Sequence, residues 1–337
     1  MERKLAVIVP NLTEGHKDQI KAATKRNGCE LRFLQTPEED KAYVQSCEIV
    51  FGHWPEVAKT STALKWIATP FAGVDQFLPP QTQVFANPEA LLTNSSGAYG
   101  VTIAEHTVMV LLSILRRDPE YRKIIAERGW KRGLAIRSVY GSRITFLGTG
   151  DIGQETAKRL RAFEPKSIIG VNRSGKNPQN LFDSIKIAGT KGNENRNGGG
   201  DEAGDWESVL SETDILIISL PGTKEAFHML GKEQLAKLPD GAIVINVGRG
   251  SVIDQQALTE ELQRGRLSVG LDVFEQEPLP QEDPLWAASN AFLTPHTAGN
   301  MTLTHTVDRI VEIFTENLDH YIKGEPLSHL VDRKKGY

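Results

Sequence analysis

Three side chains that could carry out acid–base and electrostatic chemistry follow apolar segments in the last third of the chain. Arg249 lies in the run I-N-V-G-R-G, Glu277 in G-L-D-V-F-E-Q-E-P, and His296 in T-P-H-T-A-G. Each run follows a segment that we expect to be a strand. Because ligands gather at the carboxyl ends of parallel strands, this order predicts that the three side chains meet in one crevice.

A fixed cation, a carboxylate and a titratable imidazole are the groups that hydride transfer to a 2-keto acid requires. Arg249 would bind the substrate carboxylate and polarise its keto group, because a guanidinium stays charged and presents a planar fork of donors. His296 would give a proton during reduction and take one during oxidation. Glu277 would keep that imidazole charged and oriented.

A glycine-rich turn predicts a second ligand. The run G-T-G-D-I-G spans Gly148, Gly150, Asp151, Ile152 and Gly153 and matches G-x-G-x-x-G. A predicted strand precedes it and a predicted helix follows it, so the helix amino terminus would face an anion. A simple strand-to-helix turn is the alternative reading, but the flanking elements favour dinucleotide binding.

The end of the next predicted strand distinguishes between dinucleotides. An NAD site usually has an acidic residue there, which binds the ribose 2′-hydroxyl. This chain instead has Asn172, Arg173 and Ser174, with Lys176 close behind. Arg173 could pair with a 2′-phosphate, so the sequence predicts NADP(H). NAD stays possible, since Arg173 could also stack on an adenine.

The elements that would position these residues follow an alternating strand–helix order, which favours parallel sheets with helices on both faces. In the first third, Leu5–Val9, Leu31–Leu34, Ile49–Phe51 and Leu64–Ala68 predict strands, Asp18–Lys25 predicts a helix, and Val84–Ala86 leads into an N-P turn. After Gly141 we expect strands at Arg143–Leu147, Ser167–Val171, Asp214–Ser219, Ala242–Asn246, Leu267–Leu271 and Ala291–Leu293, and a helix at Ile152–Phe163.

Three further segments have a distinct character. Ala98–Leu115 predicts a helix whose uniform apolarity suggests burial between domains or between subunits. Asn172 to Asp205 is rich in Gly and Asn and predicts an exposed loop. Thr302–Ile322 predicts a long final helix that could return to the first domain.

Composition limits the class of protein. The 337 residues allow one large or two medium domains, and the net charge of -4 comes from mixed signs, which disfavours nucleic acid or an anionic membrane as partner. Two cysteines without C-x-x-C spacing disfavour a disulfide or a thiolate metal site. The histidines are scattered, so we expect no metal. Neither a signal peptide nor a membrane span is apparent, and we expect a cytoplasmic protein.

Taken in order, these motifs resemble the D-isomer-specific 2-hydroxyacid dehydrogenases over nearly the whole chain. The resemblance includes the run F-A-G-V-D that starts at Phe71 and the run A-E-H that starts at Ala104. It implies an α/β protein with two Rossmann-like domains, in which a doubly wound dinucleotide-binding domain (101–299) is inserted into a flavodoxin-like substrate domain (1–100 and 300–337). It also implies a homodimer formed through the cofactor domain.

The resemblance assigns roles to residues. The catalytic arginine of the family corresponds to Arg249 and its proton donor to His296. Its acid corresponds to Glu277, the second glutamate of the motif, and not to Glu275. The substrate-binding set comprises Ala72, Gly73, Val74, Arg249 and His296, with Asp272 near the nicotinamide. The expected cofactor-binding set is Gly148, Gly150, Asp151, Ile152, Gly153, Asn172, Arg173, Ser174, Pro221, Val247, Gly248, Arg249, Asp272, His296 and Gly299.

The leading hypothesis is therefore an NADP- or NAD-dependent oxidoreductase that reduces glyoxylate, hydroxypyruvate or a larger 2-keto acid. A phosphoglycerate dehydrogenase-like enzyme is an alternative, although residues 69–74 offer no extra cation for a phosphate. Formate dehydrogenases are disfavoured, because their motif has Gln where this chain has Glu277. A dinucleotide-sensing protein, like the corepressors that share the predicted fold, is the alternative without catalysis.

Overall fold

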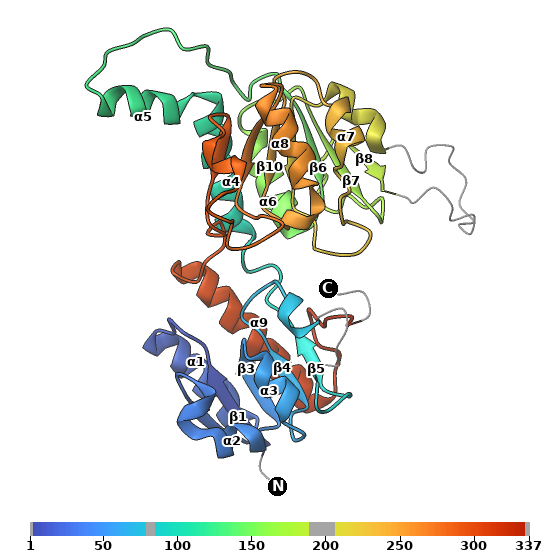
Figure 1. Ribbon diagram of the computed structural model, residues 1–337. Helices are drawn as coiled ribbons and strands as arrows, with labels where there is room; N and C mark the ends of the chain where they lie inside the picture. Colours follow the sequence, from blue (N-terminus) through green and yellow to red (C-terminus); the bar gives the residue numbers. More distant parts are fainter. Residues whose placement is uncertain (1–2, 79–84, 189–205, 334–337) are drawn as a thin grey trace, which may run out of the picture. The chain divides into compact units, whose positions relative to one another are not determined.

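The computed structural model describes residues 3–78, 85–188 and 206–333 (Figure 1). The chain divides into two compact units. Unit 1 combines Met1–Tyr99 with Asn300–Tyr337, and unit 2 is Gly100–Gly299. Each unit contains a parallel sheet with helices, so the predicted α/β class with two Rossmann-like domains is confirmed.

In unit 1 the described residues form a five-stranded parallel sheet in the order β2-β1-β3-β4-β5. Its strands are β1 (Arg3–Ile8), β2 (Cys29–Phe33), β3 (Ile49–Gly52), β4 (Trp66–Ala68) and β5 (Leu91–Thr93). Its α-helices are α1 (Glu14–Arg26), α2 (Lys41–Ser46), α3 (Pro55–Thr60) and α9 (Thr304–Lys323). This strand order is that of flavodoxin-like folds.

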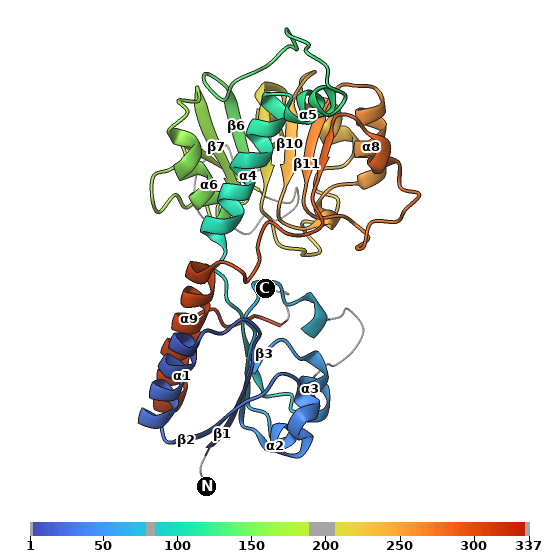
Figure 2. The same cartoon turned by 90° about the vertical axis from the view of Figure 1, so that its left-hand side faces the viewer.

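The final helix α9 packs beside α1, as Figure 2 shows. His16 Nε2 lies 2.7 Å from Asp308 Oδ1, and Arg26 makes two hydrogen bonds to Asp319. The apolar side of α9 buries Phe314, which stacks on Phe51 of β3 with ring centroids 4.0 Å apart. Through these contacts the carboxyl-terminal helix packs as part of unit 1.

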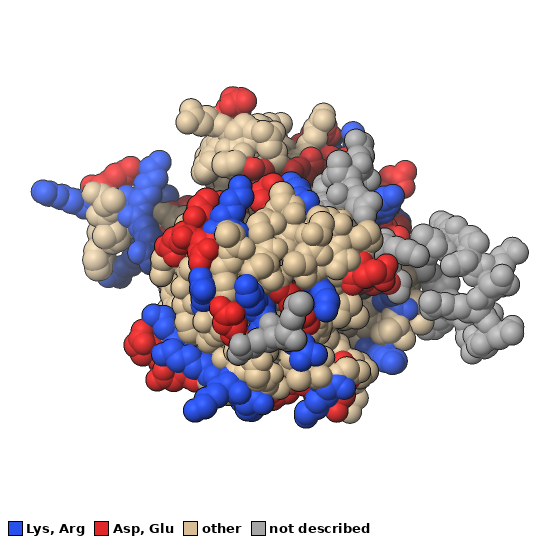
Figure 3. Space-filling view, turned by 90° about the horizontal axis from the view of Figure 1, so that it is seen from below, with Lys and Arg blue, Asp and Glu red and all other residues tan. Residues whose placement is uncertain are grey.

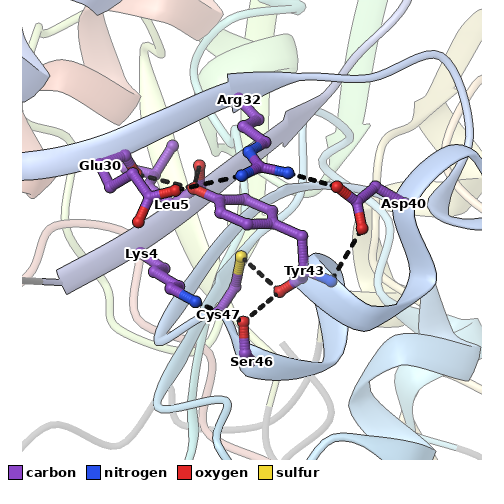
Figure 4. A network of polar contacts seen from close by, with 8 residues as sticks. All are labelled: Lys4, Leu5, Glu30, Arg32, Asp40, Tyr43, Ser46 and Cys47. Carbon is purple, nitrogen blue, oxygen red and sulfur yellow. Dashed lines mark hydrogen bonds and ion pairs between the residues drawn. The ribbon is translucent and has the colours of Figure 1, made fainter.

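A network of hydrogen bonds and a cation–π contact joins α2 to strands β1 and β2 of the unit 1 sheet (Figure 4). The Tyr43 hydroxyl donates to the carbonyl oxygens of Glu30 and Leu5, and the Arg32 guanidinium lies 4.0 Å from the centre of the Tyr43 ring. The Cys47 thiol donates to the Tyr43 carbonyl, and burial raises the pKa of this thiol to about 12. Cys47 is therefore a packing residue held in its protonated form.

The fifth strand of this sheet has no counterpart among the sequence predictions. The segment Val84–Ala86 was the last apolar run expected before the N-P turn, but Phe85 and Ala86 lie outside any strand. The strand is Leu91–Thr93, which pairs with β4. Three residues are too few to show the alternation on which strand prediction depends.

In unit 2 the described residues form a seven-stranded parallel sheet in the order β12-β11-β10-β9-β6-β7-β8. The strands are β6 (Arg143–Leu147), β7 (Ser167–Asn172), β8 (Ser184–Ile187), β9 (Ile215–Ile218), β10 (Ile243–Asn246), β11 (Ser268–Leu271) and β12 (Ala291–Leu293). The α-helices are α4 (Gly100–Leu115), α5 (Asp118–Ala126), α6 (Asp151–Arg161), α7 (Lys232–Lys237) and α8 (Gln255–Gln263). The order reverses between β6 and β9, which makes the sheet doubly wound.

The register brings the ends of five strands of unit 2 to one edge. Leu147 of β6 and Asn246 of β10 both align with Ile218 of β9. Asn246 in turn aligns with Leu271 of β11, and Leu271 aligns with Leu293 of β12. The runs that follow β6, β10, β11 and β12 therefore leave the sheet along the same edge.

The segment from Asn172 to Asp205 differs in part from the predicted loop. It contains β8, which pairs with β7, and Phe182 beside it is buried in the core. The polar composition of the whole segment hides these few apolar residues. The G-G-G run that motivated the loop prediction falls outside the described residues.

Helix α4 begins at Gly100 and packs within unit 2 against α6, β10 and β11. A Cβ atom on Gly270 would lie 2.4 Å from Val110 Cγ1, so this glycine permits the close approach of α4 to the sheet. The apolar face of α4 is thus covered inside unit 2, although Met109 on the helix is 44% exposed. Packing within unit 2 against α6, β10 and β11 thus accounts for much of the apolar character of this helix.

The surface shows no single dominant charge on the face drawn in Figure 3, where acidic and basic side chains are interspersed. Among the described residues, no helix has both the length and the apolar character needed to cross a bilayer. Cys29 and Cys47 are not joined in a disulfide.

Candidate active site

A histidine–carboxylate pair lies at the carboxyl edge of the unit 2 sheet. His296 Nδ1 is 2.7 Å from Glu277 Oε2, and Glu277 Oε1 accepts a hydrogen bond from the Phe274 backbone amide at 3.0 Å. The His296 side chain is 50% exposed. Because Nδ1 faces the carboxylate, Nε2 is the ring nitrogen available for proton exchange with a ligand.

The loop that carries His296 is held by Asp272, whose side chain is buried. Asp272 Oδ1 accepts from Thr294 Oγ1 at 2.6 Å and from the Thr297 amide at 2.8 Å, while Oδ2 accepts from the Ala298 amide at 2.9 Å. These bonds surround His296, whose backbone has φ +53°, a conformation that costs energy for a residue with a Cβ atom. Asp272 therefore positions the imidazole, a role that its place after a strand does not reveal.

His106 on α4 supports the same loop. Its Nε2 lies 3.2 Å from Thr294 Oγ1, and the hydroxyl proton of Thr294 is directed to Asp272. The hydroxyl oxygen thus accepts from the imidazole. Burial lowers the pKa of His106, which keeps it neutral as a packing residue.

Arg249 follows β10 in a tightly packed turn, in which the two neighbouring glycines lie against the backbone of other segments. A Cβ atom on Gly248 would lie 2.5 Å from the Leu220 carbonyl oxygen, and one on Gly250 would lie 1.9 Å from the Phe274 carbonyl carbon. Buried Asn246 closes the turn by donating to the Arg249 carbonyl and accepting from the Gly248 amide. The two glycines that flank Arg249 are therefore required by backbone packing, and Asn246 is a structural residue that motif reading overlooks.

The arginine turn and the histidine–carboxylate pair are joined through the loop after β11. Gly250 lies directly on the backbone of Phe274, and the amide of Phe274 donates to Glu277. Glu277 in turn contacts His296. The structure thus links the three predicted runs by direct contacts at one edge of unit 2, whereas Glu275 faces a different partner.

The glycine-rich turn between β6 and α6 fits the phosphates of a dinucleotide. Gly148 has φ +101°, and a Cβ atom on Gly153 would lie 2.4 Å from the Gly148 carbonyl oxygen. Gly150 is different, because a Cβ atom there would meet nothing within 4 Å. It leaves an open space at the amino terminus of α6, where backbone amides favour an anion.

Asn172 at the end of β7 organises the neighbouring turn. Its Nδ2 donates to Thr149 Oγ1 at 2.6 Å and to the Lys176 carbonyl at 3.0 Å, and its Oδ1 accepts from the Gly175 amide at 2.7 Å. The side chain in the position of the usual acidic residue thus connects the turn after β7 to the glycine-rich turn. This asparagine is suited to ordering the turn rather than to accepting from a ribose.

Arg173 and Ser174 are exposed on this turn. The pKa of Glu225 is lowered by hydrogen bonds from its own backbone amide and from Thr223, with a smaller contribution from Arg173. Arg173 thus contributes to the electrostatic environment of the Glu225 carboxylate.

The remaining candidates follow other strand ends. Pro221 comes after β9, and the Val247 amide donates to Ile218 at the end of that strand. Gly299 is the last residue of unit 2. In unit 1, Ala72, Gly73 and Val74 follow β4, the Ala72 carbonyl accepts from Asn94, and the Val74 side chain is buried.

Other candidate groups have local explanations. His53 contacts Thr69, Phe71 and Phe77, and Trp54 donates to the Ile8 carbonyl, so both pack within unit 1. Within the described ranges, no three His, Cys, Asp or Glu side chains are grouped in a way that could hold a metal ion.

Comparison with known proteins identifies relatives of the whole chain. The model of the family "D-isomer specific 2-hydroxyacid dehydrogenase, NAD binding domain" matches residues 108–298. A glyoxylate reductase of Korarchaeum cryptofilum is 32% identical over 249 residues, which are 72% of this chain and 69% of the relative.

Two crystal structures show the same fold. A D-isomer-specific 2-hydroxyacid dehydrogenase family protein of Aeromonas salmonicida has a TM-score of 0.82 and 27% identity, covering 99% of this chain and all (100%) of that one. A D-isomer-specific 2-hydroxyacid dehydrogenase of Xanthobacter autotrophicus, solved with NADPH and MES, has a TM-score of 0.77 and 26% identity, with 100% of both chains covered.

Proposed function

The chain belongs to the D-isomer-specific 2-hydroxyacid dehydrogenase family, and we propose that it reduces glyoxylate, hydroxypyruvate or a larger 2-keto acid with NADPH. Its activity class is thus an NAD(P)-dependent oxidoreductase that acts on 2-hydroxy acids. The observation that carries the proposal is the Glu277–His296 pair joined to the Arg249 turn at the edge where the glycine-rich turn also lies.

In the proposed mechanism, the bound reduced nicotinamide supplies the hydride. The Arg249 guanidinium holds the carboxylate of the 2-keto acid and polarises its keto group. His296 donates a proton from Nε2 to the keto oxygen, and Glu277 stabilises the charged imidazole at Nδ1. The same groups work in reverse when a D-2-hydroxy acid is oxidised.

We assign the two units different roles. The open space beside Gly150 and the turn after β7 support unit 2 as the dinucleotide-binding unit. The substrate-binding role of Ala72, Gly73 and Val74 in unit 1 rests on the family resemblance, as does the proximity of Asp272 to the nicotinamide.

A panel of 2-keto acids tests this function. We expect purified protein to oxidise NADPH in the presence of glyoxylate, hydroxypyruvate or a branched or aromatic 2-keto acid, and to form the D-enantiomer of every product that is chiral. NADPH binding without turnover of any of these acids would instead favour the dinucleotide-sensing alternative. Turnover confined to 3-phosphohydroxypyruvate would favour the phosphoglycerate dehydrogenase-like alternative.

Cofactor preference is tested at Arg173. We expect kcat/KM to be higher with NADPH than with NADH, and Arg173→Gln to lower the NADPH value roughly 10- to 100-fold with little effect on NADH, because a charge-assisted hydrogen bond is lost. Lys158→Gln on α6, an exposed cation away from the turn, is the matched control. A strong preference of the unmodified enzyme for NADH would refute this assignment.

We further propose that the protein is a homodimer that uses α5 and the segment after it. Figures 1 and 2 show this segment extending from the sheet of unit 2. No residue of α5 is buried, and Ile125, Trp130 and Tyr140 are 59%, 82% and 71% exposed. A second copy of the chain would cover these side chains.

Light scattering after size exclusion tests this proposal. We expect a dimer for the unmodified protein and a shift towards monomer for Ile125→Ser combined with Trp130→Ser. Glu127→Gln changes an exposed polar residue of the same segment and serves as the control. A monomeric unmodified protein at micromolar concentration would exclude the dimer.

A further inference from the structure

A second histidine–carboxylate pair lies near the arginine turn and takes no part in the mechanism above. His228 Nε2 is hydrogen-bonded to Glu275 Oε1, and about a third of each side chain is exposed. Glu275 precedes Glu277 by two residues, but its carboxylate is bound to His228 rather than to His296. The pair therefore needs an explanation separate from proton transfer.

The histidine side of this pair is tied to the arginine turn through the backbone. The His228 amide donates to the Ser251 carbonyl at 2.8 Å, and the Leu230 amide donates to the Val252 carbonyl at 3.0 Å. The peptide at Ser251 begins only two residues after Arg249. One flank of the arginine turn is thus paired with the segment that carries His228.

The glutamate side contacts the same carboxyl-terminal flank of the arginine turn from a second segment. The Gln255 amide at the start of α8 donates to Glu275 Oε1 at 3.2 Å, and the Glu275 amide donates to Gln255 Oε1 at 3.1 Å. A Cβ atom on Gly250 would lie 1.9 Å from the Phe274 carbonyl carbon and 2.5 Å from the Glu275 nitrogen. The turn therefore presses directly against the backbone that carries the carboxylate.

The backbone at His228 shows that this arrangement is imposed by its surroundings. His228 has φ +48°, a strained conformation for a residue with a Cβ atom, and such residues persist where several contacts fix them. The ring of Phe227, itself 60% exposed, stacks on the imidazole with centroids 4.0 Å apart. The ring orientation needed to reach Glu275 is thus supported from one face.

We propose that His228 and Glu275 are positioning residues that hold the turn carrying Arg249 in place, and we call this pair the clasp. The pair joins the segment that contacts Gly250 and the segment that contacts Ser251, the two residues that follow Arg249. It restricts movement of the Arg249 backbone and so keeps the guanidinium aligned with a 2-keto acid. The inference rests on the proposed function, because the alignment matters for catalysis only if Arg249 binds the substrate.

Steady-state kinetics on the full-length protein test the clasp. We expect His228→Ala and Glu275→Ala each to lower kcat on the order of 10-fold, because small displacements of a positioning group reduce rates steeply. KM for NADPH and the melting temperature should change little. His228→Gln should recover most of the activity, since its amide can still donate to Glu275. Lys232→Ala, which removes an exposed ion pair between α7 and α8, is the matched control.

A double variant and hydrogen exchange separate the possible failures. His228→Ala combined with Glu275→Ala should be no slower than the worse single variant. Amide exchange in residues 248–253 should be faster in either alanine variant than in the control, whether or not a substrate is known. Unchanged kcat in both alanine variants of an active enzyme, or unchanged exchange, would overturn the clasp. Lack of turnover by the unmodified protein combined with faster exchange would refute only the proposed function.

Discussion

Replacing His296 with alanine is expected to lower kcat roughly 10²- to 10⁴-fold, the range for loss of a positioned general acid. The reason lies in the local geometry: Nδ1 is bound to Glu277 at 2.7 Å, which leaves Nε2 to serve the substrate. The measurement is NADPH oxidation at saturating 2-keto acid. Because the imidazole is half exposed and lies outside the core, the variant should fold normally.

His320→Ala is the control for this prediction, because it removes another partly exposed histidine from a helix of unit 1. Its kcat should match that of the unmodified enzyme. Near-native turnover by His296→Ala would show that another group supplies the proton. An insoluble or unfolded His296→Ala variant would be replaced by His296→Gln, for which the same loss is expected.

The second large effect is expected at Arg249. Arg249→Lys should lower kcat/KM for the 2-keto acid about 10²- to 10³-fold, the scale for losing one preorganised electrostatic contact in a transition state. A lysine keeps the charge but cannot make two directed bonds in the plane of a carboxylate. The turn itself should survive, because its packing depends on Gly248, Gly250 and Asn246.

Arg264→Lys provides the matched control, since Arg264 is an exposed arginine at the end of α8 that pairs with Glu261. We expect its kinetic constants to be unchanged. If Arg249→Lys kept both the affinity and the turnover of the unmodified enzyme, the guanidinium would not be the group that binds the substrate carboxylate.

Much of the fold could be read from local patterns. The apolar run Arg143–Leu147 coincides with β6, because buried parallel strands are short and almost continuously apolar. The run Ala291–Leu293 coincides with β12, whose residues are partly buried. The glycine-rich turn was also predictable, since its spacing reflects requirements of the backbone itself. The runs around Arg249, Glu277 and His296 could be placed at the carboxyl edge of one sheet, because each run follows a predicted parallel strand.

Contacts between distant positions could not be read in this way. His228 and Glu275 are 47 positions apart, and neither has a local pattern that indicates its partner. The bonds from Asp272 to Thr297 and Ala298 likewise depend on how two loops leave adjacent strands. Strand β8 was hidden because a few apolar residues lie in a polar segment. Such features require the register of the sheet, which composition and spacing do not determine.

A crystal structure with NADP⁺ and oxamate, a stable analogue of a 2-keto acid, tests the central claim most directly. The account predicts that the carbonyl oxygen of oxamate lies within about 3 Å of His296 Nε2 and that Arg249 contacts the same ligand, with Glu277 still bound to Nδ1. Binding of oxamate away from these side chains, or an imidazole turned away from the ligand, would contradict it.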